Sequence, residues 1–217
     1  MNQTTPLFPR GILIGLMGIK RSGKDTVGDY LVSNCGFIKR AFADPLKAAC
    51  RELFLLSDDQ LYGDSKEVPD GRWYGASSRR ILQYVGTDLL RDQLDKIMPG
   101  LGTNIHTRNF ELWYNQNSGS NIIVPDVRFR NEVELIHRLG GIVVRLDRQA
   151  VITNDLHPSE TELLKIDNYD YFLDNNGTKE QLITKTVPEL MSQISSDRVY
   201  YNQYYVILER SVRELTT

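Results

Sequence analysis

The sequence has few cysteines, no long apolar run and no strong excess of one charge. Its two cysteines, Cys35 and Cys50, are too few for a disulfide framework in 217 residues, and this indicates a reducing compartment. No apolar run approaches the length of a membrane span, so we expect no membrane association. The net charge of −2 argues against a general nucleic-acid binder, because such proteins are usually basic.

The rest of the composition is typical of a soluble globular protein, with 41% hydrophobic and 25% charged residues. A chain of 217 residues suffices for one α/β domain with insertions and a sizeable core. The apolar stretch 11–19 runs directly into a glycine-rich turn rather than a small-residue cleavage site, so we expect no signal peptide.

Strand-like and helix-like segments alternate along the chain. Apolar segments predict strands over 11–17, 37–42, 121–125, 142–146 and 169–173. Helical spacing predicts helices over 43–56, 79–94, 130–139 and 178–194, and 110–114 could belong to a short helix. We expect loops over 57–78, 99–107 and 149–166. This order favours an α/β fold with a central parallel sheet and helices on both faces.

The most informative stretch is Gly18-Ile-Lys-Arg-Ser-Gly-Lys-Asp25, which joins the first predicted strand to a predicted helix over 25–31. A glycine-rich turn in this context is typical of a phosphate-binding P-loop. Glycines let the backbone wrap closely around a phosphate, and the helix N-terminus directs N–H groups at the anion. Lys24 would reach the β- and γ-phosphates of a nucleotide. Asp25 stands where a hydroxyl residue usually meets Mg²⁺, and Thr26 follows it.

Asp126 follows an apolar strand, at the sheet edge where open α/β proteins bind ligands. In P-loop enzymes an acid there holds Mg²⁺ directly or through water, although an aspartate can also cap the turn after a strand. Phosphoryl transfer accumulates charge that arginines can neutralise, and the candidates are Arg79, Arg80, Arg91, Arg128 and Arg130. Arg128 is the best placed, two residues beyond Asp126. Arg145 alternates with apolar residues in a strand, and we expect a structural role for it.

A second polar segment contains His157 and Glu160. His157 could contact a phosphate or a base, although an ordinary loop histidine gives the same pattern. The stretch Ser159-Glu-Thr-Glu162 also looks like a helix N-terminus. No cysteine and histidine spacing indicates a zinc site.

Several of these segments occur together in one family, and the chain resembles the bacteriophage deoxynucleoside monophosphate kinases. The matching segments are Gly18-Ile-Lys-Arg-Ser-Gly-Lys-Asp-Thr26, Phe42-Ala-Asp-Pro-Leu-Lys47, Arg79-Arg-Ile-Leu-Gln-Tyr-Val-Gly-Thr-Asp88, Trp113, Val124-Pro-Asp-Val-Arg128 with Glu132, His157-Pro-Ser-Glu160 and Asp174-Asn-Asn-Gly-Thr178. They span roughly residues 11–190. The family tolerates aspartate after the P-loop lysine, so Asp25 is compatible with an active site.

The resemblance implies a three-layer P-loop NTPase fold of the nucleoside-monophosphate-kinase type. It also implies transfer of the ATP γ-phosphoryl group to a deoxynucleoside 5′-monophosphate, giving a diphosphate and ADP for DNA precursor synthesis. The residues that would bind ATP are Gly18, Arg21, Ser22, Gly23, Lys24, Asp25 and Thr26. The residues that would bind the acceptor are Lys20, Lys47, Arg80, Gly86, Thr87, Trp113, Asp126, Arg128, Glu132 and His157. Lys24, Arg80, Asp126 and Arg128 would be the catalytic ones.

Two assignments stay open at this point. Mg²⁺ could be held by Asp25, Thr26 or Asp126, and the sequence does not rank them. Trp113 could stack on or border the base, but a buried core tryptophan is an equally good reading.

The expected organisation is a kinase domain over 1–194, with an acceptor-binding insertion at about 44–118 and a lid-like segment at about 147–166. The tyrosine-rich tail 195–217 could be a helix packed on the core or on a partner, which makes a homodimer conceivable. We expect ATP and Mg²⁺ as cofactors, a small nucleotide as substrate, no direct binding of nucleic acid, and a cytoplasmic location, that of the host cell if the protein is phage-encoded.

Other readings use the same motifs. A dephospho-coenzyme A kinase or a phosphomevalonate kinase also has a P-loop and a basic acceptor site. A nucleotide-binding switch module would need the P-loop but no second anion site, and the arginine segments count against it.

Overall fold

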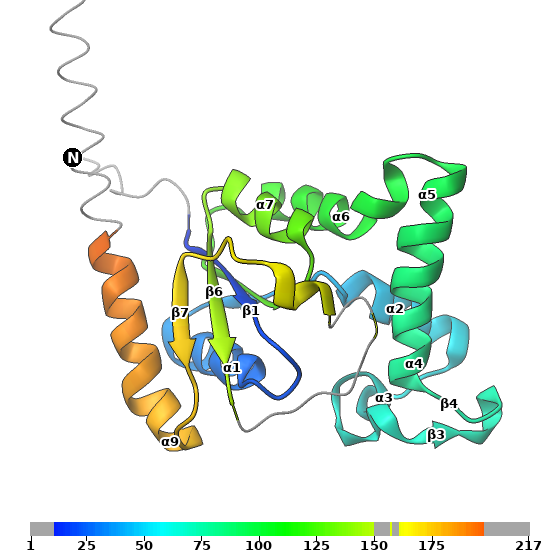
Figure 1. Ribbon diagram of the computed structural model, residues 1–217, viewed down its shortest axis with the longest axis horizontal. Helices are drawn as coiled ribbons and strands as arrows, with labels where there is room; N and C mark the ends of the chain where they lie inside the picture. The colour runs from blue at the N-terminus through cyan, green and yellow to red at the C-terminus, as the bar shows by residue number, and fades with distance from the viewer. Residues whose placement is uncertain (1–10, 150–156, 158–160, 198–217) are drawn as a thin grey trace, which may run out of the picture.

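Five parallel strands form the central sheet in the part of the chain that the computed structural model describes, residues 11–149, 157 and 161–197 (Figure 1). The strands are β1 (Leu13–Met17), β2 (Ile38–Lys39), β5 (Ile122–Val127), β6 (Ile142–Asp147) and β7 (Tyr171–Asp174). They lie in the order β2-β5-β1-β6-β7, and every neighbouring pair is parallel. The predicted parallel sheet is confirmed, although β2 is shorter than the strand predicted over 37–42.

Helices cover both faces of this sheet, and β1 shows why. All five residues of β1 are buried, and successive side chains point to opposite faces. Leu13 and Met17 pack with α6 (Leu101–Asn117) and α7 (Arg130–Arg138). Their neighbours Ile14 and Leu16 pack with α1 (Lys24–Cys35) and the C-terminal helix. That helix comprises α9 (Lys179–Gln181), the π-helix η5 (Leu182–Thr186) and further helical residues to 197. The three-layer architecture is therefore as predicted.

A helical excursion between β2 and α6 has a small core of its own. Its elements are α2 (Asp44–Phe54), α3 (Asp58–Tyr62), η1 (Asp64–Glu67), β3 (Pro69–Asp70), η2 (Gly71–Trp73), β4 (Ala76–Ser77), α4 (Ser78–Gln83), the π-helix η3 (Tyr84–Gln93) and α5 (Leu94–Ile97). The residues that form its core are Leu46, Cys50, Leu56, Leu61 and Ile81. The loop predicted over 57–78 is thus wrong in part, since Ser57 and Gln60 form a capping box that starts α3.

The loop predicted over 99–107 is also wrong, because α6 begins at Leu101. The Asp95 carboxylate accepts hydrogen bonds from the N–H groups of Gly100 and Thr103 and so caps the helix start from α5. A Cβ on Gly102 would collide with the backbone of Asp95, so glycine is what lets α6 pack closely against α5. The helix expected at 110–114 is the second half of α6.

The remaining predicted elements match more closely. The strands over 121–125, 142–146 and 169–173 correspond to β5, β6 and β7, and the helix over 130–139 is α7. Of the segment 149–166, the structure describes Gln149, His157 and the residues from 161, which include η4 (Glu162–Lys165); the rest of this segment, and the tail beyond 197, lie outside the described residues.

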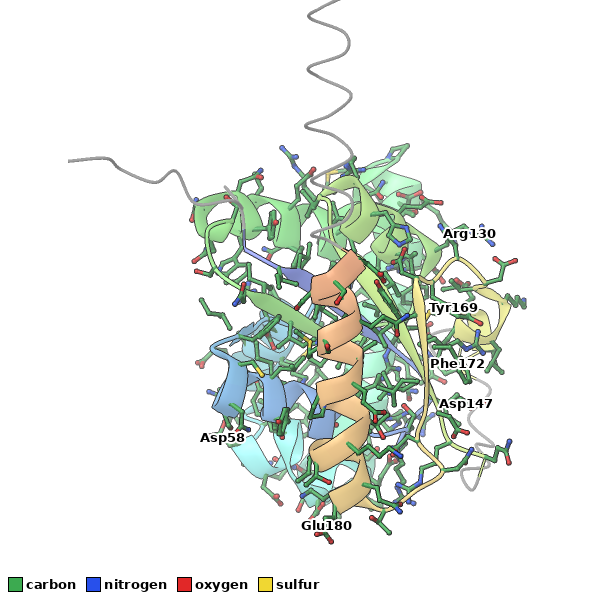
Figure 2. The ribbon with its side chains drawn as sticks, turned by 90° about the vertical axis from the view of Figure 1, so that its left-hand side faces the viewer. Asp58, Arg130, Asp147, Tyr169, Phe172 and Glu180 are labelled. Atoms are coloured by element: carbon green, nitrogen blue, oxygen red, sulfur yellow. The ribbon has the colours of Figure 1, made fainter. Side chains whose placement is uncertain are left out.

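Charged side chains such as Asp58, Arg130 and Glu180 lie on the outside of the molecule (Figure 2). None of the helices in the described residues combines the length and apolar character that a membrane crossing requires.

Candidate active site

The P-loop between β1 and α1 has a shape suited to an anion. Gly23 adopts a left-handed conformation with φ of 104°, which favours glycine, and no side chain caps the first turn of α1. The Lys24 ammonium group donates to the carbonyl oxygens of Gly18 and Ile19, both at 2.6 Å. The N–H groups at the start of α1 are therefore available to a phosphate, and a cation lies beside them.

The loop is fixed by a residue far along the chain, Asn175. Asn175, just after β7, is 4% exposed, and its Nδ2 donates to the carbonyl oxygen of the fully buried Ser22 at 2.8 Å. A Cβ on Gly23 would collide with the same Asn175 amide. The conformation of the P-loop thus depends on the packing of β7 beside β6.

A cavity of about 210 Å³ lies beside the P-loop, between the carboxyl end of β5 and the helical excursion. Its walls come from α2, α3, η1, α4, η3, α6, β5 and the start of α7. The residues that line it are Phe42, Ala43, Leu46, Lys47, Leu61, Lys66, Arg79, Leu82, Gln83, Gly86, Thr87, His106, Asp126, Arg128, Phe129 and Glu132.

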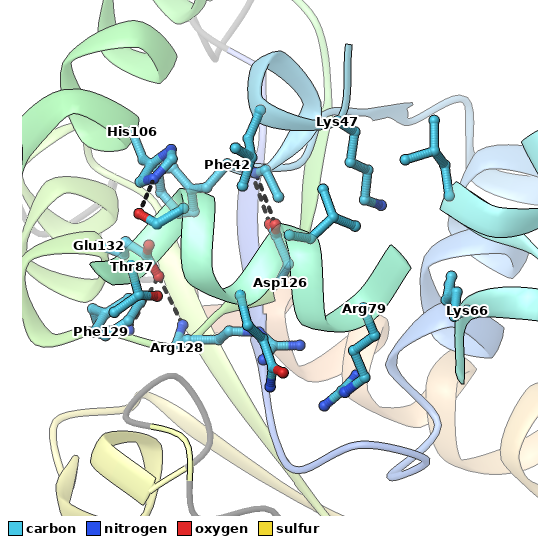
Figure 3. A pocket seen from close by; sticks show the side chains of 16 residues that line it. Phe42, Lys47, Lys66, Arg79, Thr87, His106, Asp126, Arg128, Phe129 and Glu132 are labelled. Atoms are coloured by element: carbon cyan, nitrogen blue, oxygen red, sulfur yellow. Dashed lines mark hydrogen bonds between the residues drawn. The ribbon is translucent and has the colours of Figure 1, made fainter. Parts of the chain in front are cut away.

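Four cationic side chains line this cavity: Lys47, Lys66, Arg79 and Arg128. Figure 3 places Lys47, Lys66 and Arg79 on one side of Asp126, away from His106, Thr87 and Glu132. Burial lowers the pKa of Lys47, although the Asp126 carboxylate opposes this shift. An arrangement with cations at one end is suited to a ligand whose anionic group lies at that end.

Glu67 connects the cavity to the P-loop. Its carboxylate forms an ion pair with Lys20 of the P-loop and another with Arg79 of the cavity, the latter at 3.5 Å. Because one carboxylate contacts both cations, the P-loop and the cavity lie next to each other.

Asp126 lies at the end of β5 and holds the start of α2. Its two carboxylate oxygens accept hydrogen bonds from the N–H groups of Phe42 and Ala43 at 2.9 and 3.0 Å. Burial raises the pKa of Asp126, and the two N–H groups and Lys47 oppose this shift. The carboxylate therefore has a clear structural role, which adds to any role in ligand binding.

Glu132 is a buried carboxyl group in the cavity wall. Its Oε2 accepts from the N–H groups of Arg128 and Phe129 at 2.8 and 3.1 Å, and its Oε1 lies 3.5 Å from the Arg91 guanidinium. Burial and the nearby Asp126 charge raise the pKa of Glu132 to about 7, while Arg91 opposes this shift. Arg91 also stacks on the Phe129 ring, with its Cζ 3.7 Å from the ring centre.

Gly86 and Thr87 line the cavity from the π-helix η3, a geometry frequent at functional sites. A Cβ on Gly86 would lie 2.5 Å from Cδ2 of Leu46, so the Leu46 side chain of α2 packs directly against this backbone. His106 of α6 also contacts Gly86, with Nε2 3.2 Å from the carbonyl oxygen.

Four residues predicted to bind the acceptor do not line the cavity, and one of them, Lys20, lies in the P-loop and pairs with Glu67. Arg80 is exposed, with its guanidinium 5.6 Å from the Tyr84 ring, and its neighbour Arg79 is the arginine that lines the cavity. Trp113 packs against the core beneath Arg40. His157 lies 3.6 Å from Asp88.

Two further arginines, Arg130 and Arg145, do not line the cavity either. Arg130 is exposed at the start of α7 (Figure 2). Arg145 donates to the carbonyl oxygen of Ile166 at 2.9 Å, so its predicted structural role is confirmed.

The predicted Mg²⁺ ligands differ in their surroundings. No group of three or more histidine, cysteine or acidic side chains gathers to hold a metal among the described residues. Mg²⁺ usually keeps several waters and takes one or two carboxylates together with substrate phosphate oxygens, so such a group is not required. The Asp25 side chain is 86% exposed at the P-loop, whereas both Asp126 oxygens already accept backbone hydrogen bonds. Thr26 is half-buried.

Several cavity residues had little or no sequence signal. Arg79 was one of five candidate arginines, and only its helical phase separates it from Arg80. Lys66 lies in a segment predicted as loop, and His106 in another. Assigning each residue of 78–83 to the buried or the exposed face of a helix would separate the two arginines. Nothing in the sequence singles out His106.

A P-loop at the first strand of a parallel sheet, beside a cavity lined by cations, defines a phosphotransferase of the P-loop class. The family model for deoxynucleotide monophosphate kinase matches residues 12–63 and 66–186, and the chain belongs to this family.

Known proteins are similar over most of the chain. A protein of Acanthamoeba polyphaga mimivirus, named "Putative deoxynucleotide monophosphate kinase", is 52% identical over 191 residues, which cover 85% of this chain and 95% of the relative. The deoxynucleotide monophosphate kinase of Enterobacteria phage T4 is 25% identical over 232 residues, which cover 80% and 96%. A solved shikimate kinase from Aquifex aeolicus has a TM-score of 0.42 at 15% identity, covering 87% of this chain and 99% of that one.

Proposed function

We propose that this protein transfers the γ-phosphoryl group of ATP to a deoxynucleoside 5′-monophosphate, giving the diphosphate and ADP for DNA precursor synthesis. The observation that carries this proposal is the pair of adjacent anion sites, the P-loop and the cationic cavity, joined through Glu67. Membership of the deoxynucleotide monophosphate kinase family supports the same acceptor class.

On the donor side, the start of α1 and Lys24 hold the phosphates of ATP. Lys24 is 8% exposed, and its ammonium group donates to two carbonyl oxygens of the loop that would hold the phosphates. Its charge offsets the negative charge that develops on the β- and γ-phosphates.

On the acceptor side, Arg79, Arg128 and Lys47 hold the monophosphate. An acceptor phosphate oxygen attacks the γ-phosphorus atom in line, the bond to the β–γ bridging oxygen breaks, and ADP leaves. A phosphate monoester oxygen is already nucleophilic at neutral pH, so the protein supplies position and charge rather than a strong base. The helical excursion within 44–118, which contributes most of the cavity wall, is the acceptor-binding part.

Mg²⁺ would supply positive charge that offsets part of the negative charge of the ATP phosphates. We assign its protein contact to Asp25 or Thr26 at the start of α1. Asp126 is the weaker candidate because it already holds the backbone of α2.

The test is an ADP-release assay with ATP, Mg²⁺ and one acceptor at a time. Acceptors are the deoxynucleoside monophosphates, modified deoxynucleotides, dephospho-coenzyme A and phosphomevalonate. We expect ADP formation only with a deoxynucleoside monophosphate. Exclusive turnover of another acceptor, or ATP binding without acceptor-stimulated ADP, would contradict the proposal and favour a different kinase or a switch module.

The variant Lys24→Met should lose at least about 100-fold in kcat, because it removes the cation at the transferred phosphate. Lys185→Met is the matched control, since Lys185 is exposed on η5. Circular dichroism and thermal melting establish that both variants fold. Normal activity in folded Lys24→Met would show that the P-loop assignment is wrong.

A further inference from the structure

His106 lies at the end of the cavity away from most of the cations. Figure 3 shows it on the same side of Asp126 as Thr87 and Glu132, opposite Lys47 and Arg79. A monophosphate whose phosphate lies at the cationic end therefore directs its sugar and base toward His106.

The hydrogen bond to Gly86 determines which ring nitrogen of His106 carries the proton. Nε2 lies 3.2 Å from the Gly86 carbonyl oxygen, which can only accept, so Nε2 is the donor. Burial lowers the pKa of His106, and the charge of Arg91 acts in the same direction. The neutral ring then has a lone pair on Nδ1.

The Nδ1 atom of His106 is at least partly exposed. Within the described part of the chain it accepts no hydrogen bond, and it is not among the buried polar atoms that lack a partner. His106 lines the cavity, so this partly exposed acceptor is a candidate contact for a ligand there.

We propose that His106 accepts a hydrogen bond through Nδ1 from the acceptor nucleotide and helps to select it. This inference rests on the proposed function above. The ligand chemistry is a neutral donor, either an N–H group of the base or the 3′-hydroxyl of the sugar. A nucleotide without a donor at that position leaves the acceptor unpaired and binds less well.

Two substitutions separate this role from a structural one. The amide of His106→Gln reaches about as far as Nε2, so it keeps the bond to Gly86 and lacks an acceptor at Nδ1. The oxygen of His106→Asn lies near the position of Nδ1, so it keeps the acceptor and lacks the bond to Gly86. We expect kcat/KM for the preferred deoxynucleotide to fall about tenfold in His106→Gln and to stay within about threefold in His106→Asn.

The donor group is identified by repeating the comparison with the 2′,3′-dideoxy analogue of the same nucleotide. If the loss in His106→Gln disappears with the analogue, the 3′-hydroxyl is the donor; if it persists, the base is. Wild-type kcat/KM in His106→Gln, or equal losses in both variants, would overturn the proposal.

A measurement on the wild-type protein does not depend on whether the variants fold. The ¹⁵N resonance of the His106 Nδ1 should shift when the preferred deoxynucleotide is added, and an unchanged resonance at saturation overturns the proposal. Failure of the proposed function looks different, because the wild-type protein then turns over no deoxynucleoside monophosphate at all.

Discussion

The raised pKa of Glu132 makes the stability of the protein depend on pH in a direction opposite to that of a normally paired carboxylate. Its pKa rises from 4.5 to about 7 in the folded protein because the side chain is buried and Asp126 lies nearby. Between these two values the folded state binds more protons than the unfolded state. The free energy of unfolding therefore falls as the pH rises from about 4.5 to about 7. Above pH 7 the whole of this loss of stability is present.

The size of this effect follows from the same two values. A difference of about 2.5 in pKa, at about 1.4 kcal/mol for each, gives a total of about 3–4 kcal/mol. No discount for solvent is needed, since the Glu132 side chain is only 4% exposed. Glu132→Gln does not titrate in this range, so wild type should lose about 3 kcal/mol relative to this variant between pH 4.5 and pH 8.

Urea unfolding of both proteins at several pH values and constant ionic strength measures this difference directly. Glu134→Gln is the matched control, because Glu134 is exposed on the same helix α7. Its difference from wild type should vary by less than about 0.5 kcal/mol. If the difference between wild type and Glu132→Gln is constant across this pH range, Glu132 does not bind a proton there and the reasoning is refuted.

Two further predictions concern the cavity wall. Arg79→Ala should lower kcat/KM about 100-fold, whereas Arg80→Ala should change it less than about threefold, because of these two arginines only Arg79 lines the cavity. Steady-state kinetics measures both values, and equal losses would contradict this assignment. Gly86→Ala places a methyl group 2.5 Å from Cδ2 of Leu46 and should cost about 1–3 kcal/mol in chemical denaturation while raising KM for the acceptor but not for ATP. Gly119→Ala, with open space around its Cβ, is the control, and equal stability of the two variants would be the contrary result.

The sheet and its layers could be predicted because β strands of this type are buried on both faces. Near-continuous apolar runs such as Leu13–Met17 and Ile122–Val124 need no partner to be recognised, since both faces of each strand meet a helix. The P-loop could be predicted for a related reason. Its glycines and lysine are required by local backbone geometry, and Gly23 with φ of 104° shows that requirement.

The start of α6 could not be predicted, because the groups that stabilise it belong to the preceding helical segment rather than to α6 itself. Asp95 of α5 caps the helix, and Gly102 is favoured by the close packing of α5 rather than by its helix propensity. Local propensity alone favours a loop here.

The cavity shows the same limit at the level of single side chains. Asp126 and Arg128 could be predicted from their position after a strand. Which of Arg79 and Arg80 lines the cavity depends on which face of α4 each occupies. Whether His106 lines it depends on how α6 packs against η3. These are properties of packing between elements that no local pattern records.

The hydrogen bond from Asn175 to Ser22 bears on when, during synthesis, the P-loop obtains all of its contacts. It joins residues 153 positions apart, so the loop after β1 obtains one of its fixing contacts from the residue that follows β7. Contacts of such long range form late, because a large loop must close before they can contribute. A ribosome-bound chain that ends before β7 lacks this contact although its P-loop residues were made long before. The full set of contacts around the P-loop is therefore complete only after β7 has been made.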